Sequence, residues 1–180
     1  MAHRQNLILR ELSAKDESAF LAWVSDWDGD RLSWATFVWE PGMEHSEHLR
    51  KLEEQKQKTK LPANMVPSTM LYGFSGEHIV GRMNIRHELN ESLTQRGGHL
   101  GYAVSPRFRK QGFATELFRQ SIAACRKLGL NDILVTCGDQ NHASWRIIEK
   151  FGGLLENTFD DRRTGEIVRR YWVNIASNQL

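Results

Sequence analysis

Cysteine is scarce in this chain, which has only Cys125 and Cys137 among its 180 residues. The two lack the spacing of a metal-binding pair and are too few for a disulfide framework, so a disulfide-rich secreted domain is not expected. Long apolar runs are also missing, which argues against a membrane-spanning helix. Residues 1–6 lead directly into a short apolar strand instead of a signal-peptide core, so we expect a cytoplasmic protein.

An excess of charge of one sign is absent as well. Lys and Arg number 24 and Asp and Glu 22, which gives a formal net charge of +2. This balance supplies no long-range field for a nucleic acid or a membrane surface, and neither partner is expected. The arginine pairs 162–163 and 169–170 are interspersed with acidic residues and predict a solvated hairpin, with an RNA-associated protein kept as an alternative.

Repeats, linkers and low-complexity tracts are missing too, so residues 1–180 are expected to form one domain with a sizeable core. Aromatic residues gather in the first third of this domain. Four apolar residues there have the i, i+3, i+4, i+7 spacing of a helix with one buried face: Phe20, Trp23, Val24 and Trp27. Ser13-x-x-Asp16 predicts a capping box that opens this helix. Trp34 and Trp39 follow without clear periodicity and are candidate walls of a substrate pocket.

A mostly polar run, Glu44–Lys58, predicts a largely exposed helix with Leu49 and Leu52 as its apolar anchors. His45 and His48 lie three residues apart on it, which is a spacing that could hold a metal ion. No HExxH pattern or second ligand cluster accompanies them, so no metal is expected.

Strand and helix patterns alternate along the rest of the chain. Seven runs predict strands: Leu7–Leu12, Thr69–Phe74, Ile79–Ile85, Leu100–Ser105, Ile133–Cys137, Leu154–Phe159 and Ile167–Ile175. Helices are predicted over Phe113–Leu128 and Asn141–Phe151. A turn signal at residues 75–78 predicts an antiparallel hairpin, whereas the alternation after residue 100 implies parallel neighbours joined by crossovers. We therefore expect a mixed β-sheet flanked by helices.

The junction of the strand at residue 100 with the following helix is a basic turn with a central glycine. Arg109 and Lys110 bring positive charge, and Gly112 lets the backbone approach a ligand without a Cβ in the way. The first amides of the helix point outward as donors to an anion. This turn therefore predicts a phosphate site, and we interpret it as the pyrophosphate site of a coenzyme.

Arg109-x-x-Gly112-x-Ala114 is similar to the Arg/Gln-x-x-Gly-x-Gly/Ala signature of the GNAT superfamily of N-acetyltransferases, which bind acetyl-coenzyme A (acetyl-CoA). Residues 141–152 resemble the family's Asn-x-x-Ser-x-Arg-x-x-Glu-Lys-x-Gly helix. Segments of the intervening chain further resemble a group of predicted acetyltransferases without known substrates: 66–69, 84–90 and 97–101. The likeness covers roughly residues 66 to 174 and leaves the first third unassigned.

The resemblance implies a GNAT-like acyl-CoA N-acyltransferase fold of the α/β (α+β) class, with a mixed, centrally splayed β-sheet. It implies acetyl-CoA as co-substrate, with the backbone of the strand at Ala103 and Val104 facing the pantetheine and the thioester oxygen. The pyrophosphate would lie against the turn formed by Arg109, Lys110, Gln111, Gly112, Phe113, Ala114 and Thr115. Asn141 and Ser144 would hydrogen-bond the pantetheine arm.

The catalytic groups are less fixed by the resemblance. Many relatives carry a Tyr just before the Glu-Lys of the last helix to protonate the departing thiolate, but this chain has Ile148 there. Three other side chains are alternative proton donors: Tyr102, Cys137 and Ser144. The family often places a Glu at the start of the splayed strand where this chain has Gly98 and His99, so Glu88 and His99 are the candidate bases for the acceptor amine.

The expected activity is transfer of an acetyl group from acetyl-CoA to a primary amine by direct attack, with no covalent enzyme intermediate. The acceptor is a small-molecule or peptide amine, and the oligomeric state is left open between a monomer and a homodimer. A module that binds or senses coenzyme A (CoA) without catalysis is the alternative, since the Tyr of the last helix is missing. A phosphotransferase is not expected, because the basic turn lacks Gly-Lys-Ser/Thr.

Overall fold

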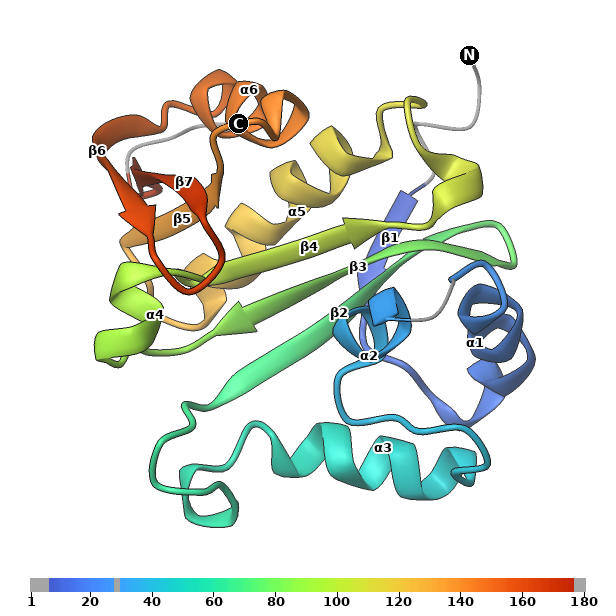
Figure 1. Cartoon of the computed structure of the whole chain (residues 1–180). Helices are drawn as coiled ribbons and strands as arrows, with labels where there is room; N and C mark the ends of the chain where they lie inside the picture. The colour runs from blue at the N-terminus through green and yellow to red at the C-terminus, as the bar shows by residue number, and fades with distance from the viewer. Residues whose placement is uncertain (1–6, 28–29, 177–180) are drawn as a thin grey trace.

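Two antiparallel β-sheets meet in the structure, a computed structural model that describes residues 7–27 and 30–176 (Figure 1). The first sheet has the order β1-β2-β3-β4 and consists of β1 (Leu7–Arg10), β2 (Ser68–Ser75), β3 (His78–Arg86) and β4 (Leu100–Val104). The second has the order β5-β7-β6 and consists of β5 (Asp132–Gly138), β6 (Leu154–Asp161) and β7 (Glu166–Asn174). Residues 1–6, from which we argued against a signal peptide, lie outside the described residues.

Helices cover both faces of the first sheet (Figure 1). One face carries α1 (Glu17–Val24), α2 (Asp30–Thr36) and α3 (His45–Glu54), and the other carries α5 (Phe113–Lys127). The short α4 (Glu91–Gln95) connects β3 to β4, and α6 (His142–Lys150) packs on β5 and β7. None of the described helices has the length and apolarity that crossing a bilayer would require.

The two covered faces explain why β2 and β3 are buried along almost their whole length. Neighbouring residues of a strand point to opposite faces. Leu71 and Met83 accordingly belong to the core beneath α5, whereas Tyr72 packs with Trp23 in a second, aromatic core beneath α1. The predicted buried face of the first helix is confirmed by this aromatic core, in which Phe20 and Trp23 are almost fully buried.

The pairing of strands differs from the prediction at two places after residue 100: β4 and β5 do not pair, and β7 lies between β5 and β6. Every strand pair among the described residues is antiparallel, including the confirmed β2–β3 hairpin. The predicted parallel neighbours β4 and β5 form no ladder. They meet just before β4, where the His99 amide donates to the Leu134 carbonyl (2.7 Å) and the Leu134 amide donates to Nδ1 of His99 (2.9 Å). Beyond this contact the strands separate, and the splay divides the structure into two sheets.

Gly98 makes the contact between the sheets sterically possible. Its φ is +60°, and a Cβ at this position would lie 2.3 Å from the Leu134 carbonyl oxygen. Only glycine tolerates both the left-handed backbone and such a close approach to another main chain. The position of β5 relative to β4 is therefore fixed by this residue.

The anchors of α3 differ from the prediction. Leu49 and Leu52 are only partly buried, whereas His45 and His48 are buried against the aromatic core. The His48 ring lies 4.5 Å from the Phe20 ring, and burial lowers the pKa of His48 to about 4, so the imidazole is neutral at pH 7 and packs as an aromatic ring. No group of potential metal ligands occurs among the described residues.

The helix α4 is not among the predicted elements. It is short, but Asn90 caps it by accepting a hydrogen bond from the Leu93 amide (2.9 Å). Asn at a helix N-cap is a recognisable signal. No apolar periodicity follows this Asn, so the sequence pattern alone does not predict a helix here.

Alanine substitutions at Gly98 and Gly76 separate the effect of close approach from that of backbone strain. Both residues have a φ of +60°, but no atom lies within 4 Å of a Cβ at Gly76. We predict that Gly98→Ala lowers the free energy of unfolding by about 3 kcal/mol, through overpacking and left-handed strain. Gly76→Ala should lower it by about 1 kcal/mol, from strain alone. Equal losses in urea unfolding would show that the contact between the sheets is not tight.

The carboxylate of Asp16 provides a test at acidic pH. It accepts hydrogen bonds from Arg10 (2.7 and 2.8 Å) and from the Ser13 amide (2.7 Å), as in the predicted capping box. The bonds from Arg10 are the main reason why the pKa of Asp16 lies well below its ordinary value of 3.8. Because folding lowers this pKa, the stabilisation is present above about pH 4 and is lost as the pH falls.

We predict that Asp16→Asn lowers the free energy of unfolding by about 2 kcal/mol at pH 7, since bonds to a charged group are lost. The difference from the wild type should be smaller at pH 3, where unfolding itself protonates the carboxyl group. Urea unfolding at both pH values measures this. Glu17→Gln, at an exposed neighbouring position, is the control. A difference that does not change with pH would contradict the role assigned to the Asp16 charge.

Candidate active site

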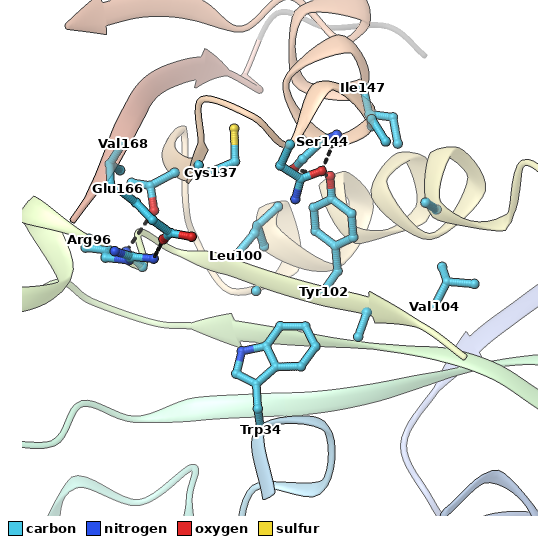
Figure 2. Close-up of a pocket in the computed structure, with 18 of the residues that line it drawn as sticks. Trp34, Arg96, Leu100, Tyr102, Val104, Cys137, Ser144, Ile147, Glu166 and Val168 are labelled. Carbon is cyan, nitrogen blue, oxygen red and sulfur yellow. Dashed lines mark hydrogen bonds and ion pairs between the residues drawn. The ribbon is translucent and has the colours of Figure 1, made fainter. Parts of the chain in front are cut away.

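A cavity of about 850 Å³ opens where the two sheets separate (Figure 2). Its walls include β4 from Leu100 to Val104 and the end of β5 from Thr136 to Gly138. The first turns of α5 and α6 also line it. Figure 2 shows Trp34 of α2 on the opposite side of the β4 ribbon from Tyr102. The splay thus makes both faces of β4 accessible to one cavity.

The start of α5 lies at one end of this cavity. Gly112 is its N-cap with a φ of +86°, and the preceding Lys110 is also left-handed with a φ of +60°. The bond from the Glu116 amide to the Gly112 carbonyl is 3.3 Å long, so the amides before Glu116 have no carbonyl within the helix to accept them. Arg109 lines the cavity and donates from Nε to the Val104 carbonyl (3.2 Å). Amides and a guanidinium therefore gather where an anionic group could be held.

The structure places the residues predicted to bind the coenzyme in two groups. Six line the cavity: Ala103, Val104, Arg109, Ala114, Asn141 and Ser144. Five belong to the turn or the first turn of α5 without lining the cavity: Lys110, Gln111, Gly112, Phe113 and Thr115. Of these, the Phe113 side chain is buried in the core, so only its backbone could face a ligand. Coenzyme binding by both groups stays a prediction.

A hydrogen-bonded cluster lies between β4, β5 and α6 and consists of the side chains of Tyr102, Cys137 and Ser144 (Figure 2). The Tyr102 hydroxyl and Ser144 Oγ are 2.8 Å apart, and burial raises the pKa of Tyr102 to about 12. Burial likewise raises the pKa of Cys137 to about 11, although a hydrogen bond with Ser144 acts in the opposite direction. Asn141 caps α6 by accepting from the Ser144 amide (3.2 Å), which holds Ser144 in place. All three groups of the cluster carry their protons at pH 7.

Ile148, which occupies the position of the family's Tyr, is fully buried and belongs to the core beneath α5. The neighbouring Ile147 lines the cavity instead. The side chain at position 148 therefore points away from the site. Tyr102 on β4 is the only tyrosine among the described residues that line the cavity.

The two candidate bases, Glu88 and His99, do not line the cavity. Glu88 is exposed and forms an ion pair with Lys58 (2.7 Å), outside the residues that line the cavity. His99 is buried, and its Nδ1 accepts the Leu134 amide at the contact between the sheets. Burial also lowers the pKa of His99. Glu88 thus lies at the surface and His99 at the contact between the sheets, and their role as bases stays a prediction.

The first third of the chain contributes two tryptophans to the cavity. Trp34, a predicted wall, lines it and remains about half exposed (52%). Trp39 does not line it, because its ring packs in the aromatic core against Phe20, with ring centroids 5.6 Å apart. Trp27, predicted only as part of a buried helix face, is buried and also lines the cavity.

Charged lining residues were missed by the sequence analysis. Arg96 forms an ion pair with Asp161 (2.6 Å) and a short one with Glu166 (Figure 2). Glu166 is the only carboxylate among the described residues that line the cavity. Arg86 lines the cavity as well. Its guanidinium donates to the carbonyls of Gly97 and Gly98, and these contacts form only when the chain is folded, so the sequence pattern does not reveal them.

Comparison with known proteins agrees with this architecture. The Vibrio fischeri ribosomal-protein-S5-alanine acetyltransferase has the same fold, with a TM-score of 0.66 and 16% identity over 98% of this chain and 96% of that one. A ribosomal L7/L12 alpha-N-protein acetyltransferase in complex with CoA gives a TM-score of 0.63 and 14% identity over 96% of each chain. A Salmonella typhimurium protein solved with its cofactor acetyl-CoA gives 0.60 and 12% identity over 97% of this chain and 96% of that one.

No curated protein matches the sequence. The model of the acetyltransferase (GNAT) domain family, in contrast, matches residues 6–153. This range includes the basic turn, the start of α6 and most of the cavity walls described above. The chain therefore belongs to the GNAT acetyltransferase family.

Proposed function

We propose that this protein transfers an acetyl group from acetyl-CoA to a primary amine by direct attack. The observation that carries the proposal is the cavity at the sheet splay, with helix amides and Arg109 at one end and the Tyr102–Ser144 pair in its wall. Membership of the GNAT acetyltransferase family and the CoA and acetyl-CoA complexes of similar structures support it. The acceptor amine and the residue roles are our inference.

The residues present fit an acyl-coenzyme A. The diphosphate would lie against the amides of the first turn of α5, beside the Arg109 guanidinium, because helix N-termini and arginine both favour phosphate oxygens. Asn141 and Ser144 would contact the pantetheine arm, and the backbone of Ala103 and Val104 would lie along it. When bound, acetyl-CoA supplies the acetyl group already activated as a thioester.

Tyr102 is proposed as the proton donor to the thiolate. Its pKa of about 12 means that the hydroxyl carries its proton throughout the neutral range, and Ser144 Oγ holds it in place at 2.8 Å. A thiol with a pKa of about 8.5 leaves without a proton at pH 7 at a cost of about 2 kcal/mol. A positioned hydroxyl lowers this cost, because it shares its proton with the sulfur as the thiolate departs.

Cys137 supports direct transfer over an acetyl-enzyme route. It is the only cysteine among the described residues of the cavity wall, and its pKa of about 11 keeps it as a thiol at neutral pH. The thiolate is the nucleophilic form of cysteine. An acetylated cysteine intermediate is therefore not part of the proposal.

The acceptor enters the proposed reaction as its free base. Alkyl amines with a pKa near 10.4 are mostly protonated at pH 7, so the rate is expected to rise with pH. Glu166 is held by Arg96 and is not assigned as a base. The names of two similar structures specify protein substrates, which makes a peptide N-terminus one acceptor class to test beside small amines.

A module that binds CoA without catalysis is the second candidate. It is favoured by one observation, namely that the described cavity wall contains no carboxylate or histidine free of an ion pair to deprotonate an amine. Release of CoA thiol on addition of amines separates the two candidates, because only the enzyme releases it.

Aspartate substitutions at the two ends of α5 test the coenzyme site. Gly112 at the N-cap and Gly129 just after the helix both have left-handed φ, +86° and +79°, so backbone strain is similar. We predict that Gly112→Asp lowers CoA affinity at least about 100-fold in calorimetry, because a carboxylate would replace the phosphate next to the amides. Gly129→Asp should leave the affinity unchanged. Equal effects of the two changes would contradict a diphosphate site at the N-terminus of α5.

Phenylalanine substitutions test the proton donor. We predict that Tyr102→Phe lowers kcat about 30-fold at pH 7, the rate equivalent of about 2 kcal/mol. The deficit should shrink above about pH 8.5, where the thiolate leaves readily without a proton. CoA affinity should change little. Tyr72→Phe is the control, since Tyr72 is buried in the aromatic core and its hydroxyl has no hydrogen-bond partner among the described residues. A deficit that is the same at every pH would contradict proton donation by Tyr102.

A further inference from the structure

Three polar side chains occupy one face of β3, which is otherwise an apolar strand. Arg82, Asn84 and Arg86 are spaced by two residues and therefore project to the same side of the sheet, toward α2. Gly101 of β4 lies opposite Asn84 in the strand pairing. This face is distinct from the one that carries Tyr102, which packs against α5. The polar face of β3 therefore lies on the opposite side of the sheet from Tyr102 and the proposed coenzyme site.

Arg82 is fully buried and positions the wall of the cavity. Its guanidinium donates to the carbonyls of Trp34 (2.7 Å), Ala35 (3.0 Å) and Gly101 (2.9 Å), and it lies 4.5 Å from the centre of the Trp34 ring. It thus joins the end of α2 to β4. Burial lowers its pKa to about 9, so it is still a cation at pH 7.

Arg86 brings a second guanidinium to the same place. Its Nη1 donates to the carbonyls of Gly97 (3.1 Å) and Gly98 (3.0 Å), and the side chain lines the cavity. A Cβ on Gly101 would lie 3.6 Å from Nη2 of Arg86 and 3.9 Å from Nη1 of Arg82. Gly101 lines the cavity, and the position of its missing Cβ lies within contact distance of both guanidinium groups.

The two charges have no counterion among the described side chains. Arg96 and Arg169 near the cavity are each paired with a carboxylate, whereas Arg82 and Arg86 donate only to backbone carbonyls. Buried cations are costly unless they are paired. This site is therefore electrostatically incomplete without an anion.

We propose that the acceptor carries a carboxylate and that this group binds above Gly101, in contact with Arg86 and within the field of Arg82. Trp34 forms the apolar side of the same site. The identification of this ligand as the acceptor rests on the proposed acetyl transfer. The anion site itself does not depend on that proposal. Polyamines and other purely cationic amines are poor ligands here, because they would add positive charge beside two unpaired guanidinium groups.

A comparison of a charged and an uncharged ligand tests the anion site without any acetyl transfer. The probes are N-acetylglycine and N-acetylglycinamide, which differ in the carboxylate alone and have no amine to react. Each is titrated by calorimetry into the protein, both alone and saturated with CoA. We expect N-acetylglycine to bind at least about tenfold more tightly, as a charge-assisted hydrogen bond to arginine contributes about 1.5–3 kcal/mol. Equal affinity of the two probes overturns the proposal.

Two variants locate the site. Arg86→Gln should remove the preference for the carboxylate, and Gly101→Ala should weaken N-acetylglycine binding by filling the space while keeping both guanidinium groups. The methyl group added at Gly101 meets its neighbours at ordinary contact distances, so this variant is expected to fold even if Arg86→Gln does not. Arg50→Gln, on the exposed face of α3, is the control. A carboxylate preference that persists in Gly101→Ala contradicts the location.

Kinetics with amine acceptors then separates this inference from the proposed function. We expect kcat/KM at least about tenfold higher for glycine or an acidic peptide than for the matching amide. If the protein binds N-acetylglycine selectively but acetylates no amine, the anion site stands and the enzymatic proposal fails. If amines are acetylated with no preference for a carboxylate, the enzymatic proposal stands and the anion site fails.

Discussion

The contact between His99 and Leu134 joins the main chains of the two sheets, and the geometry of the site depends on it. Two reciprocal hydrogen bonds and the missing side chain of Gly98 bring the main chains together there. Because β4 and β5 form no ladder beyond this contact, the backbone of β4 borders a cavity instead of another strand. A continuous ladder would bury the same backbone groups. The absence of pairing is thus the structural condition for a cleft in which a coenzyme arm can lie along a strand edge.

The two faces of β4 separate the two halves of the proposed reaction. Tyr102 points toward α5 and α6, where Ser144 and the start of α5 lie, whereas Gly101 points toward α2 and the arginines of β3. Strand alternation enforces this division, since neighbouring residues face opposite sides. Because helices cover both of its faces, the first sheet is mostly apolar on each, and the polar face of β3 is an exception in its core. We interpret this polarity as the recognition of an anionic substrate group, because fold stability alone would be served by apolar residues.

Local signals in the sequence predict much of the fold. The helix α5 is evident from its apolar stripe and its glycines at both ends, and the β2–β3 hairpin from its turn residues. The basic turn can also be predicted from the sequence, because its residues are contiguous. The histidine face of α3 could not be predicted, because His48 behaves as an apolar ring only once it is packed against Phe20. The splay was expected only from the family resemblance, because one strand–helix–strand pattern is by itself compatible with both a ladder and a gap. The roles of Arg82 and Arg86 depend on carbonyls from α2 and residues 97–101, which no local pattern brings together.

If the edge of β4 and the first turn of α5 together bind the coenzyme, as we propose, CoA protects both segments at once. Amide hydrogen exchange of the protein with and without CoA measures this most directly, because it reports on the backbone groups assigned to binding. We expect slower exchange at residues 101–104 and 112–115 when CoA is present, with β2 and β3 little changed. Unchanged exchange in both segments at saturating CoA, or protection confined to other elements, would contradict it.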